Sequence, residues 1–188
     1  MAGRAPLRAA AAGAIIAILA VAVLAADQLA KHAVLTGLPY LQPVHVIGNF
    51  LVFYLIKNAG AAFSLGTGVT WVFTLALSAV AVAIIWLGIT RVRSRAWAVV
   101  LGLLLGGVLG NLGDRLFREP GFGVGHVVDF ISTPWMMPAI YNVADMFITT
   151  MMVCVALLVL FGVRLDGRPR DRRTGRGGEE GEEREASE

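Results

Sequence analysis

Two aspartates beside an apolar stretch are the residues of this chain best suited to chemistry. Asp129 and Asp145 lie within residues 125–147, GHVVDFISTPWMMPAIYNVADMF. A charged side chain in the hydrocarbon of a membrane costs at least about 2.5–3.5 kcal/mol, so an acid retained there is a candidate functional group. Two carboxyl groups that share a site cannot both ionise easily, so one stays protonated while the other can act as a base toward water. Such a pair can hydrolyse an amide bond.

The second aspartate belongs to a polar stripe on a predicted helix. Asn142, Asp145 and Thr149 are spaced by three and four residues, which places them on one helical face, while Met146 and Phe147 help to cover the rest. The polar face must therefore meet protein or water rather than lipid. For Asp145 alone, a structural acid held by Asn142 and a neighbouring helix is an equally good interpretation, and the second acid favours chemistry.

The composition predicts a membrane protein. The chain has 188 residues, of which 57% are hydrophobic and 15% charged, and its mean hydropathy is +0.72. The net charge of +3 comes with arginines in loops and the tail, where membrane topology explains them, so no nucleic-acid partner is inferred. Cys154 is the single cysteine, which excludes an intramolecular disulfide and favours a packing role.

Four apolar segments are long enough to be membrane spans, and together they predict one α-helical membrane domain over residues 1–163. They cover about residues 9–26, 69–90, 96–112 and 139–163. The first could be a secretory signal peptide, because Arg4 and Arg8 precede it and small residues end it. The three later spans and the polar residues from Asp27 onward favour an uncleaved span. The tail, residues 164–188, is rich in Arg, Gly and Glu and is predicted to be disordered.

The basic residues predict the orientation of the spans. Arginines cluster before the first span, in the connection between the second and third, and after the fourth. The positive-inside rule makes that side cytoplasmic, with both chain ends there. Asp129 and Asp145 are then expected at the extracytoplasmic face of the cell membrane.

The segment between the first two spans predicts a β-hairpin. Residues 44–47 and 50–56 are rich in β-branched and aromatic residues, and Gly48-Asn49 between them is a turn signal. Two strands alone are marginally stable, so we expect a small extracytoplasmic sheet that rests against the membrane surface or the helices.

The third span carries a stripe of small residues. Gly102, Gly106 and Gly110 recur every four residues, which favours tight helix contact, and the fourth span is the expected partner. Asp114 and Arg115 follow at the outer end and are predicted to form a supporting charged pair.

Other motifs are weak. His126 lies near Asp129, but with no HExxH motif and two other histidines in the chain, a zinc site is disfavoured, and we predict neither metal nor cofactor. The GFGVG run at residues 121–125 does not follow a strand of a βαβ unit, so it indicates a loop rather than a dinucleotide site. Without a convincing base partner for a serine or cysteine, a covalent nucleophile is also disfavoured.

Five ordered motifs across residues 9–163 resemble the bacterial lipoprotein signal peptidases, signal peptidase II. They are Asp27-Gln28-x-x-Lys31, Asn58-Ala59-Gly60-Ala61-Ala62-Phe63-Ser64, Gly110-Asn111-x-x-Asp114-Arg115, Val127-Val128-Asp129-Phe130 and Tyr141-Asn142-Val143-Ala144-Asp145. Two features depart from the family pattern: a tyrosine stands at position 141, where phenylalanine is common, and the charged tail has no counterpart.

The resemblance implies an aspartic endopeptidase with four membrane helices and a small extracytoplasmic sheet. Such enzymes remove the signal peptide of diacylglyceryl-modified prolipoproteins just before the lipidated cysteine, in contact with membrane lipids. The catalytic acids would be Asp129 and Asp145. The supporting or substrate-binding set would be Asp27, Lys31, Asn58, Gly60, Asn111, Asp114, Arg115 and Asn142.

Two other classes of protein also place acids in membrane spans. A small transporter would show internal repeats and broken helices near the midplane, whereas these acids cluster toward one face. A non-catalytic scaffold would use the acids to join helices, and replacing Asp129 would then change stability alone.

Overall fold

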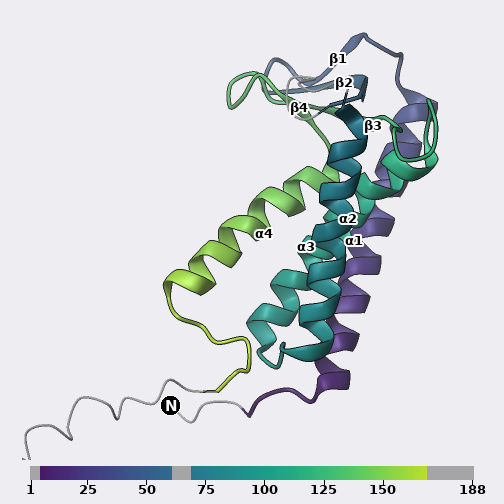
Figure 1. Ribbon diagram of the computed structural model, residues 1–188. Coiled ribbons are helices and arrows are strands. Elements are labelled where there is room, and N and C mark those ends of the chain that lie inside the picture. Colours follow the sequence, from purple (N-terminus) through teal and green to yellow (C-terminus); the bar gives the residue numbers. More distant parts are fainter. Residues whose placement is uncertain (1–4, 61–68, 169–188) are drawn as a thin grey trace, which may run out of the picture.

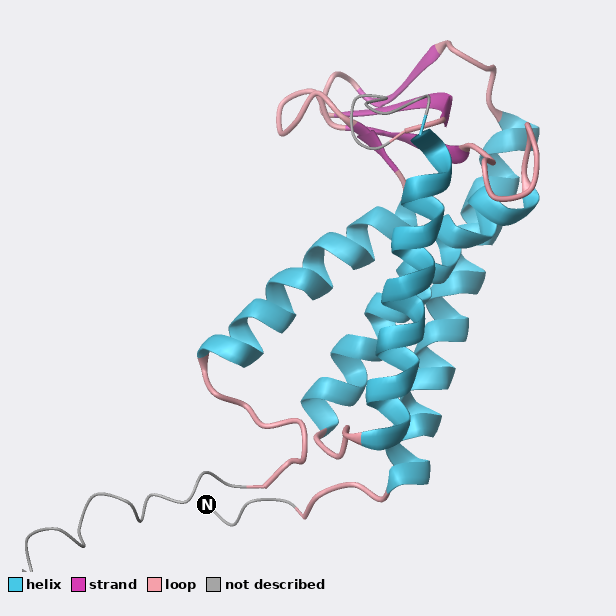
Figure 2. Cartoon of the chain, in the orientation of Figure 1, coloured by secondary structure: helices cyan, strands magenta, loops and turns pink. Residues whose placement is uncertain are grey.

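The computed structural model describes residues 5–60 and 69–168 of the chain. Within these residues, four helices long and apolar enough to cross a membrane carry a four-stranded antiparallel sheet at one end (Figures 1 and 2). This architecture confirms the predicted class, a helical membrane protein with a small sheet. In chain order the elements are α1 (Ala9–Gly37), β1 (Pro43–Ile47), β2 (Leu51–Asn58), α2 (Thr70–Thr90), α3 (Arg95–Phe117), β3 (Val127–Ser132), β4 (Ile140–Tyr141) and α4 (Val143–Leu160).

The helices do not end where the apolar runs end. The first helix continues from the predicted limit near residue 26 to Gly37, because the polar residues beyond that limit, Asp27 and Lys31, are fully buried against other helices. The third helix likewise extends past residue 112 to Phe117. The fourth begins at Val143 rather than at residue 139, since the chain just before it forms the short strand β4.

Helix α3 is the centre of the bundle. Of the most apolar 18-residue stretch of α3, 72% is buried inside the protein, against 11% for the corresponding stretch of α4. A side chain at Gly106 would meet the Cβ of Val23 on α1 at 2.6 Å, and Gly102 meets α1 in the same way. The prediction that this stripe packs against the fourth span is therefore wrong for both glycines. Gly107, on the adjacent stripe, is the residue that lets α4 approach closely.

The sheet follows the strand order β1-β2-β3-β4. The predicted hairpin is confirmed as β1 and β2, with Gly48 in the turn at a φ of +49°, which favours glycine. Strand β2 then continues to Asn58, opposite Val127 of β3, and Ile56 lies opposite Asp129. Because side chains alternate along a strand, Asn58 and Asp129 lie on one face of the sheet. The other face packs against α1 through Val34, Leu55, Val128 and Phe130.

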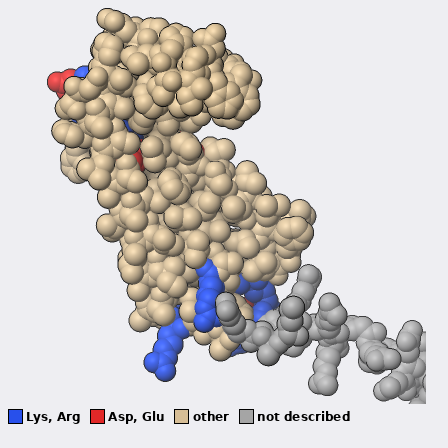
Figure 3. Space-filling view, turned by 180° about the vertical axis from the view of Figure 1, so that it is seen from behind, with Lys and Arg blue, Asp and Glu red and all other residues tan. Residues whose placement is uncertain are grey.

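The three arginine-bearing segments meet at the end away from the sheet. The backbone N–H of Leu7 donates to the carbonyl of Arg93 (2.8 Å), and the N–H of Arg93 donates to Leu165 (2.8 Å). Figure 3 shows Lys and Arg atoms gathered at this end below a broad surface almost free of charge. These contacts place the segments on one side of the bundle, while its cytoplasmic orientation stays a prediction.

Candidate active site

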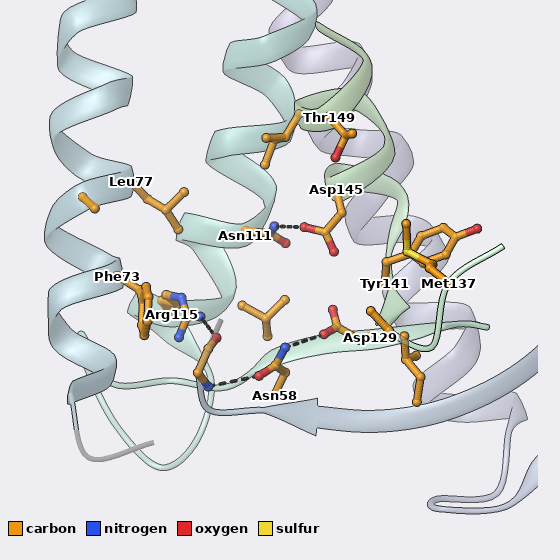
Figure 4. Close-up of a pocket in the computed structure, with 16 residues that line it drawn as sticks. Asn58, Phe73, Leu77, Asn111, Arg115, Asp129, Met137, Tyr141, Asp145 and Thr149 are labelled. Atoms are coloured by element: carbon orange, nitrogen blue, oxygen red, sulfur yellow. Dashed lines mark hydrogen bonds between the residues drawn. The ribbon is translucent and has the colours of Figure 1, made fainter. Parts of the chain in front are cut away.

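A cavity of about 400 Å³ opens where the sheet meets the helices. Strand β3 supplies Asp129 and helix α4 supplies Asp145, and Figure 4 shows both carboxylates turned toward this space. Its other polar lining residues are Asn58, Asn111, Arg115, Tyr141 and Thr149. The apolar part of the lining includes Phe73, Ala76, Leu77, Val127, Met137, Ile140 and Ile148.

Asp129 is held by amide groups alone. The side-chain nitrogen of Asn58 donates to its Oδ2 (2.8 Å), and that of Asn142 donates to its Oδ1 (2.6 Å). The side chain is only 2% exposed. Burial and then the nearby charge of Asp145 raise the pKa of Asp129 to about 7, because both disfavour the ionised form more than the two amide hydrogen bonds favour it. This carboxyl can therefore carry a proton near neutral pH.

Asp145 sits in the first turn of α4, where the helix start fixes its position. Its Oδ2 accepts the backbone N–H of Asn142 (3.1 Å), and the Oδ1 of Asn142 accepts the backbone N–H of Asp145 (3.0 Å), which completes a capping box. Its Oδ1 accepts from the Nδ2 of Asn111 (2.7 Å). The same local sequence that starts the helix thus orients the second carboxyl.

Two asparagine side chains connect the acids to each other. Asn142 donates from Nδ2 both to Asp129 and to the Oδ1 of Asn111 (3.1 Å), and Asn111 donates in turn to Asp145. Asn142 is fully buried. An amide bridge of this kind fixes the two carboxyls relative to each other without bringing a formal charge to either.

A second pair of buried acids lies behind the cavity, and these acids are paired with cations. The ammonium of Lys31 contacts the Oδ2 of Asp27 (2.8 Å) and the Oδ2 of Asp114 (2.9 Å), and all three side chains are fully buried. Arg118 donates from Nε to the Oδ1 of Asp114 (2.6 Å). Gln28 adds hydrogen bonds to both acids. The cluster formed by Asp27, Lys31, Asp114 and Arg118 is called the ionic cluster below.

The ionic cluster positions the elements that carry the cavity acids. The Oδ1 of Asp27 accepts the backbone N–H of Ala144 (2.9 Å), next to Asp145, and the Oδ2 of Asp114 accepts that of Val128 (3.1 Å), next to Asp129. Lys31 also donates to the Oδ1 of Asn111 (3.0 Å). Asp27 comes this close because α3 has a glycine at position 110, where a Cβ would lie 2.6 Å from its Oδ2.

Arg115 does not have the predicted partner. Its Nη2 donates to the carbonyl of Gly60 (2.6 Å), and its guanidinium lies over the ring of Phe73, 5.4 Å from the centroid. Asp114 instead pairs with Lys31 and Arg118. The prediction of an Asp114–Arg115 pair is wrong, because successive helical residues point about 100° apart. Arg115 fixes the end of β2 beside the cavity.

The structure gathers all ten predicted site residues at one place. Asn58, Gly60, Asn111, Arg115, Asp129 and Asp145 line the cavity, and Asp27, Lys31, Asp114 and Asn142 lie directly behind it. Residues 61–64 of the second predicted motif lie outside the described residues. Among the described residues, no three His, Cys, Asp or Glu side chains come together in a group that could hold a metal ion.

Sequence reasoning missed three residues of the site region. Phe73 and Leu77 form the α2 wall of the cavity, and nothing in an evenly apolar helix distinguishes them beforehand. Arg118 had a usable signal, since it follows Asp114 by four residues on the same helix.

The fold and the site define a multi-span membrane protein with two carboxyls facing one cavity. A family model described as signal peptidase (SPase) II matches residues 19–161. A lipoprotein signal peptidase of Leifsonia xyli is 51% identical over 154 residues, covering 82% of this chain and 70% of that protein. One from Mycobacterium tuberculosis is 45% identical over 147 residues, covering 78% and 71%.

A solved structure agrees with these sequence relatives. A bacterial membrane enzyme, 28% identical, superposes with a TM-score of 0.68 and covers 77% of this chain and 86% of that one. The chain belongs to the signal peptidase II family and is a membrane-embedded peptidase.

Proposed function

We propose that this protein is an aspartic endopeptidase that removes the signal peptide of diacylglyceryl-modified prolipoproteins just before the lipidated cysteine. The observation that carries the proposal is the pair Asp129 and Asp145. They face one cavity and are held by amides, and among the described residues neither forms an ion pair. The named relatives are lipoprotein signal peptidases, which supports this class of substrate.

The chemistry requires one proton on the pair. With one carboxyl protonated and the other ionised, the ionised acid takes a proton from a water molecule as that water attacks the scissile carbonyl. The protonated acid donates a hydrogen bond to the oxygen that becomes negative and then helps to protonate the leaving amine. The pKa of about 7 for Asp129 supports a shared proton at neutral pH. The two groups titrate as a unit, so the apparent values belong to the pair.

The cavity walls suit a substrate that is part peptide and part lipid. Phe73, Ala76 and Leu77 on α2 face Ile148 on α4 across an apolar section, whereas the acids lie at the sheet end. Figure 1 shows α4 inclined away from the other three helices. We propose that the diacylglyceryl group approaches sideways from the membrane between α2 and α4, and that the peptide lies beneath the sheet.

The reaction is proposed to occur at the extracytoplasmic membrane surface. In a Cys154→Ser background, a cysteine at Glu119, which is exposed at the sheet end, should react with a membrane-impermeant thiol reagent in whole cells. One at Thr90, exposed at the opposite end, should not react. The reverse labelling pattern would contradict the orientation and the proposed reaction side with it.

The decisive experiment is cleavage of a purified prolipoprotein by the full chain in lipid. Wild-type protein should cleave the diacylglyceryl-modified substrate before its lipidated cysteine, and Asp129→Asn should not. The control substrate is the same precursor without the lipid. Equal cleavage of both substrates would refute the lipid requirement, and cleavage by Asp129→Asn would refute the aspartic mechanism. If the protein were a non-catalytic scaffold, Asp129→Asn would change only its stability.

A further inference from the structure

Two adjoining hollows lie outside the catalytic cavity, one between α1 and α3 and one against the sheet. The first, about 580 Å³, runs along α1 and α3 and is lined by leucines at positions 24, 109, 112 and 116. The second, about 300 Å³, lies at the sheet end and is lined by Lys57, His126 and Leu35. Phe117 and Arg118 line both hollows, so they form one groove that is apolar at one end and charged at the other, where Lys57 and Arg118 lie beside the carboxylates of Glu119 and Asp114.

We propose that this groove, called the α1–α3 groove, binds one anionic glycerophospholipid. Its acyl chain would lie along the leucines, and its phosphate would lie between Lys57 and Arg118. This site goes beyond the proposed peptidase reaction, in which the diacylglyceryl group of the substrate occupies the side between α2 and α4.

The sheet register separates the α1–α3 groove from the catalytic cavity. Lys57 lies opposite Val128 in the β2–β3 ladder, and both line the groove. Their chain neighbours Asn58 and Asp129 line the catalytic cavity. Because successive residues of a strand point to opposite faces, a ligand in the groove cannot also contact the two acids.

The charged end of the groove lies at the depth expected for a lipid phosphate. The apolar lining that α3 gives the groove continues through Leu112 and Leu116 to Phe117, which is 81% exposed and ends the helix, and Arg118 follows. A phospholipid places its phosphate just outside the hydrocarbon layer, at this polar–apolar boundary. Figure 3 shows acidic and basic atoms side by side at the sheet end of a surface whose middle is nearly free of charge.

Each of the two cations is bound to a carboxylate, and the Lys57 pair is the more exposed of the two. Arg118 is oriented by the Oδ1 of Asp114 (2.6 Å) and the Oε1 of Gln28 (3.3 Å), so its guanidinium is held at the junction of the hollows. Lys57 pairs with Glu119 (3.1 Å), whose side chain is 86% exposed. Exposed pairs of this kind contribute little, so a phosphate can displace Glu119 from Lys57.

Native mass spectrometry of the full chain in detergent, titrated with phosphatidylglycerol or phosphatidylcholine, tests the charge requirement. We expect one phosphatidylglycerol bound at least about tenfold more tightly than phosphatidylcholine. Lys57→Gln should weaken the binding of phosphatidylglycerol about fivefold. Glu119→Gln should strengthen that binding, since the competing carboxylate is gone. Arg168→Gln removes the same charge at the far, exposed end and should change nothing. Equal affinity for both lipids, or an equal loss in Arg168→Gln, would overturn the proposal.

A second pair of variants tests the acyl-chain part. Gly113 lines the α1–α3 groove, and a Cβ there would meet no atom within 4 Å, so Gly113→Leu fills the groove without a clash. Gly13→Leu on α1 is the matched control, because its Cβ is equally unobstructed and it does not line the groove. Gly113→Leu should weaken the binding of phosphatidylglycerol at least about tenfold, and Gly13→Leu should leave this binding unchanged. Full binding in Gly113→Leu, or an equal loss in both variants, would overturn the assignment.

Discussion

Two pairs of acids lie next to each other in this protein, and they are held in opposite ways. Asp27 and Asp114 share the ammonium of Lys31 at 2.8 and 2.9 Å. Asp129 and Asp145 receive only N–H groups of amides at 2.6 to 3.1 Å. The first pair joins α1 to α3, whereas the second faces a cavity. The difference lies in where the protein places its buried cations.

An acid with a bonded cation has its charge compensated and serves as a structural link. An acid among neutral amides has no such compensation, so burial and a like charge raise its pKa, as for Asp129. Asn111 lies between the two pairs: its side-chain oxygen accepts a hydrogen bond from Lys31, and its side-chain nitrogen donates one to Asp145. We infer that the ionic cluster holds the fold while the amide-held pair is left free to exchange a proton.

The strongest test of this comparison is to neutralise the amide-held acids. Asp129→Asn and Asp145→Asn should each lower turnover by at least about 10³-fold, because each removes one of the two proton-transfer groups. Both variants should stay folded, since neither acid forms an ion pair among the described residues. Turnover of a lipidated precursor, measured beside thermal unfolding in detergent, checks both expectations. Retained cleavage by either variant would remove the distinction between the two pairs.

The reverse pattern is expected when the ionic cluster loses its shared cation. Lys31→Met leaves Asp27 buried with no ion-pair partner among the described residues and Asp114 with Arg118, which should cost about 3–5 kcal/mol of stability. Activity should fall with the amount of folded protein and with the loss of the hydrogen bond to Asn111. Denaturant titration in detergent measures the stability.

A double variant provides the matched control for Lys31. Asp27→Asn added to Lys31→Met removes the acid whose ion-pair partner among the described residues was Lys31 alone, and should recover part of the lost stability. If Lys31→Met unfolds at the same denaturant concentration as wild type, the ionic cluster is not what holds α1 against α3.

The comparison also explains what could be predicted from the sequence. Asp129, Asp145 and Asn142 could be predicted because polar residues are conspicuous beside apolar runs, whereas Lys31, Asn58 and Asn111 follow from the family resemblance. The helices and the hairpin follow from hydropathy and turn signals. The partners were less predictable. Adjacent position suggested that Arg115 pairs with Asp114, but helix geometry turns Arg115 toward Gly60.

Helix packing was the other feature that could not be predicted from the sequence. The glycine stripe of α3 predicts that another helix packs closely against it. Glycine allows close approach to any helix, so the stripe does not identify the neighbour. Only the tertiary arrangement directs Gly106 to α1 and Gly107 to α4. The cavity wall at Phe73 could not be recognised either, because every face of α2 is apolar.

The pH dependence of stability tests the raised pKa of Asp129, one of the two amide-held acids. The pKa of Asp129 is 3.8 in an ordinary environment and about 7 in the folded protein, so between these values the folded state holds a proton that the unfolded state has lost. Stability should therefore fall as pH rises from about 4 to 7, by up to about 4 kcal/mol, and change no further above that range. Asp129→Asn should lack this contribution. Unfolding at several pH values measures it, and parallel profiles for the two proteins would contradict the raised pKa.

The smallest effect is expected at Cys154, which belongs to neither pair of acids. It lies half-buried in α4 and does not line the catalytic cavity. Serine is nearly isosteric, and its hydroxyl can bond to the helix carbonyl of Thr150, so Cys154→Ser should change stability by less than about 0.5 kcal/mol and leave turnover intact. Thermal unfolding and precursor cleavage, run beside Asp129→Asn, measure both. Loss of turnover in a folded Cys154→Ser protein would mean that a thiol takes part in the reaction, and the contrast between the two pairs would then no longer account for catalysis.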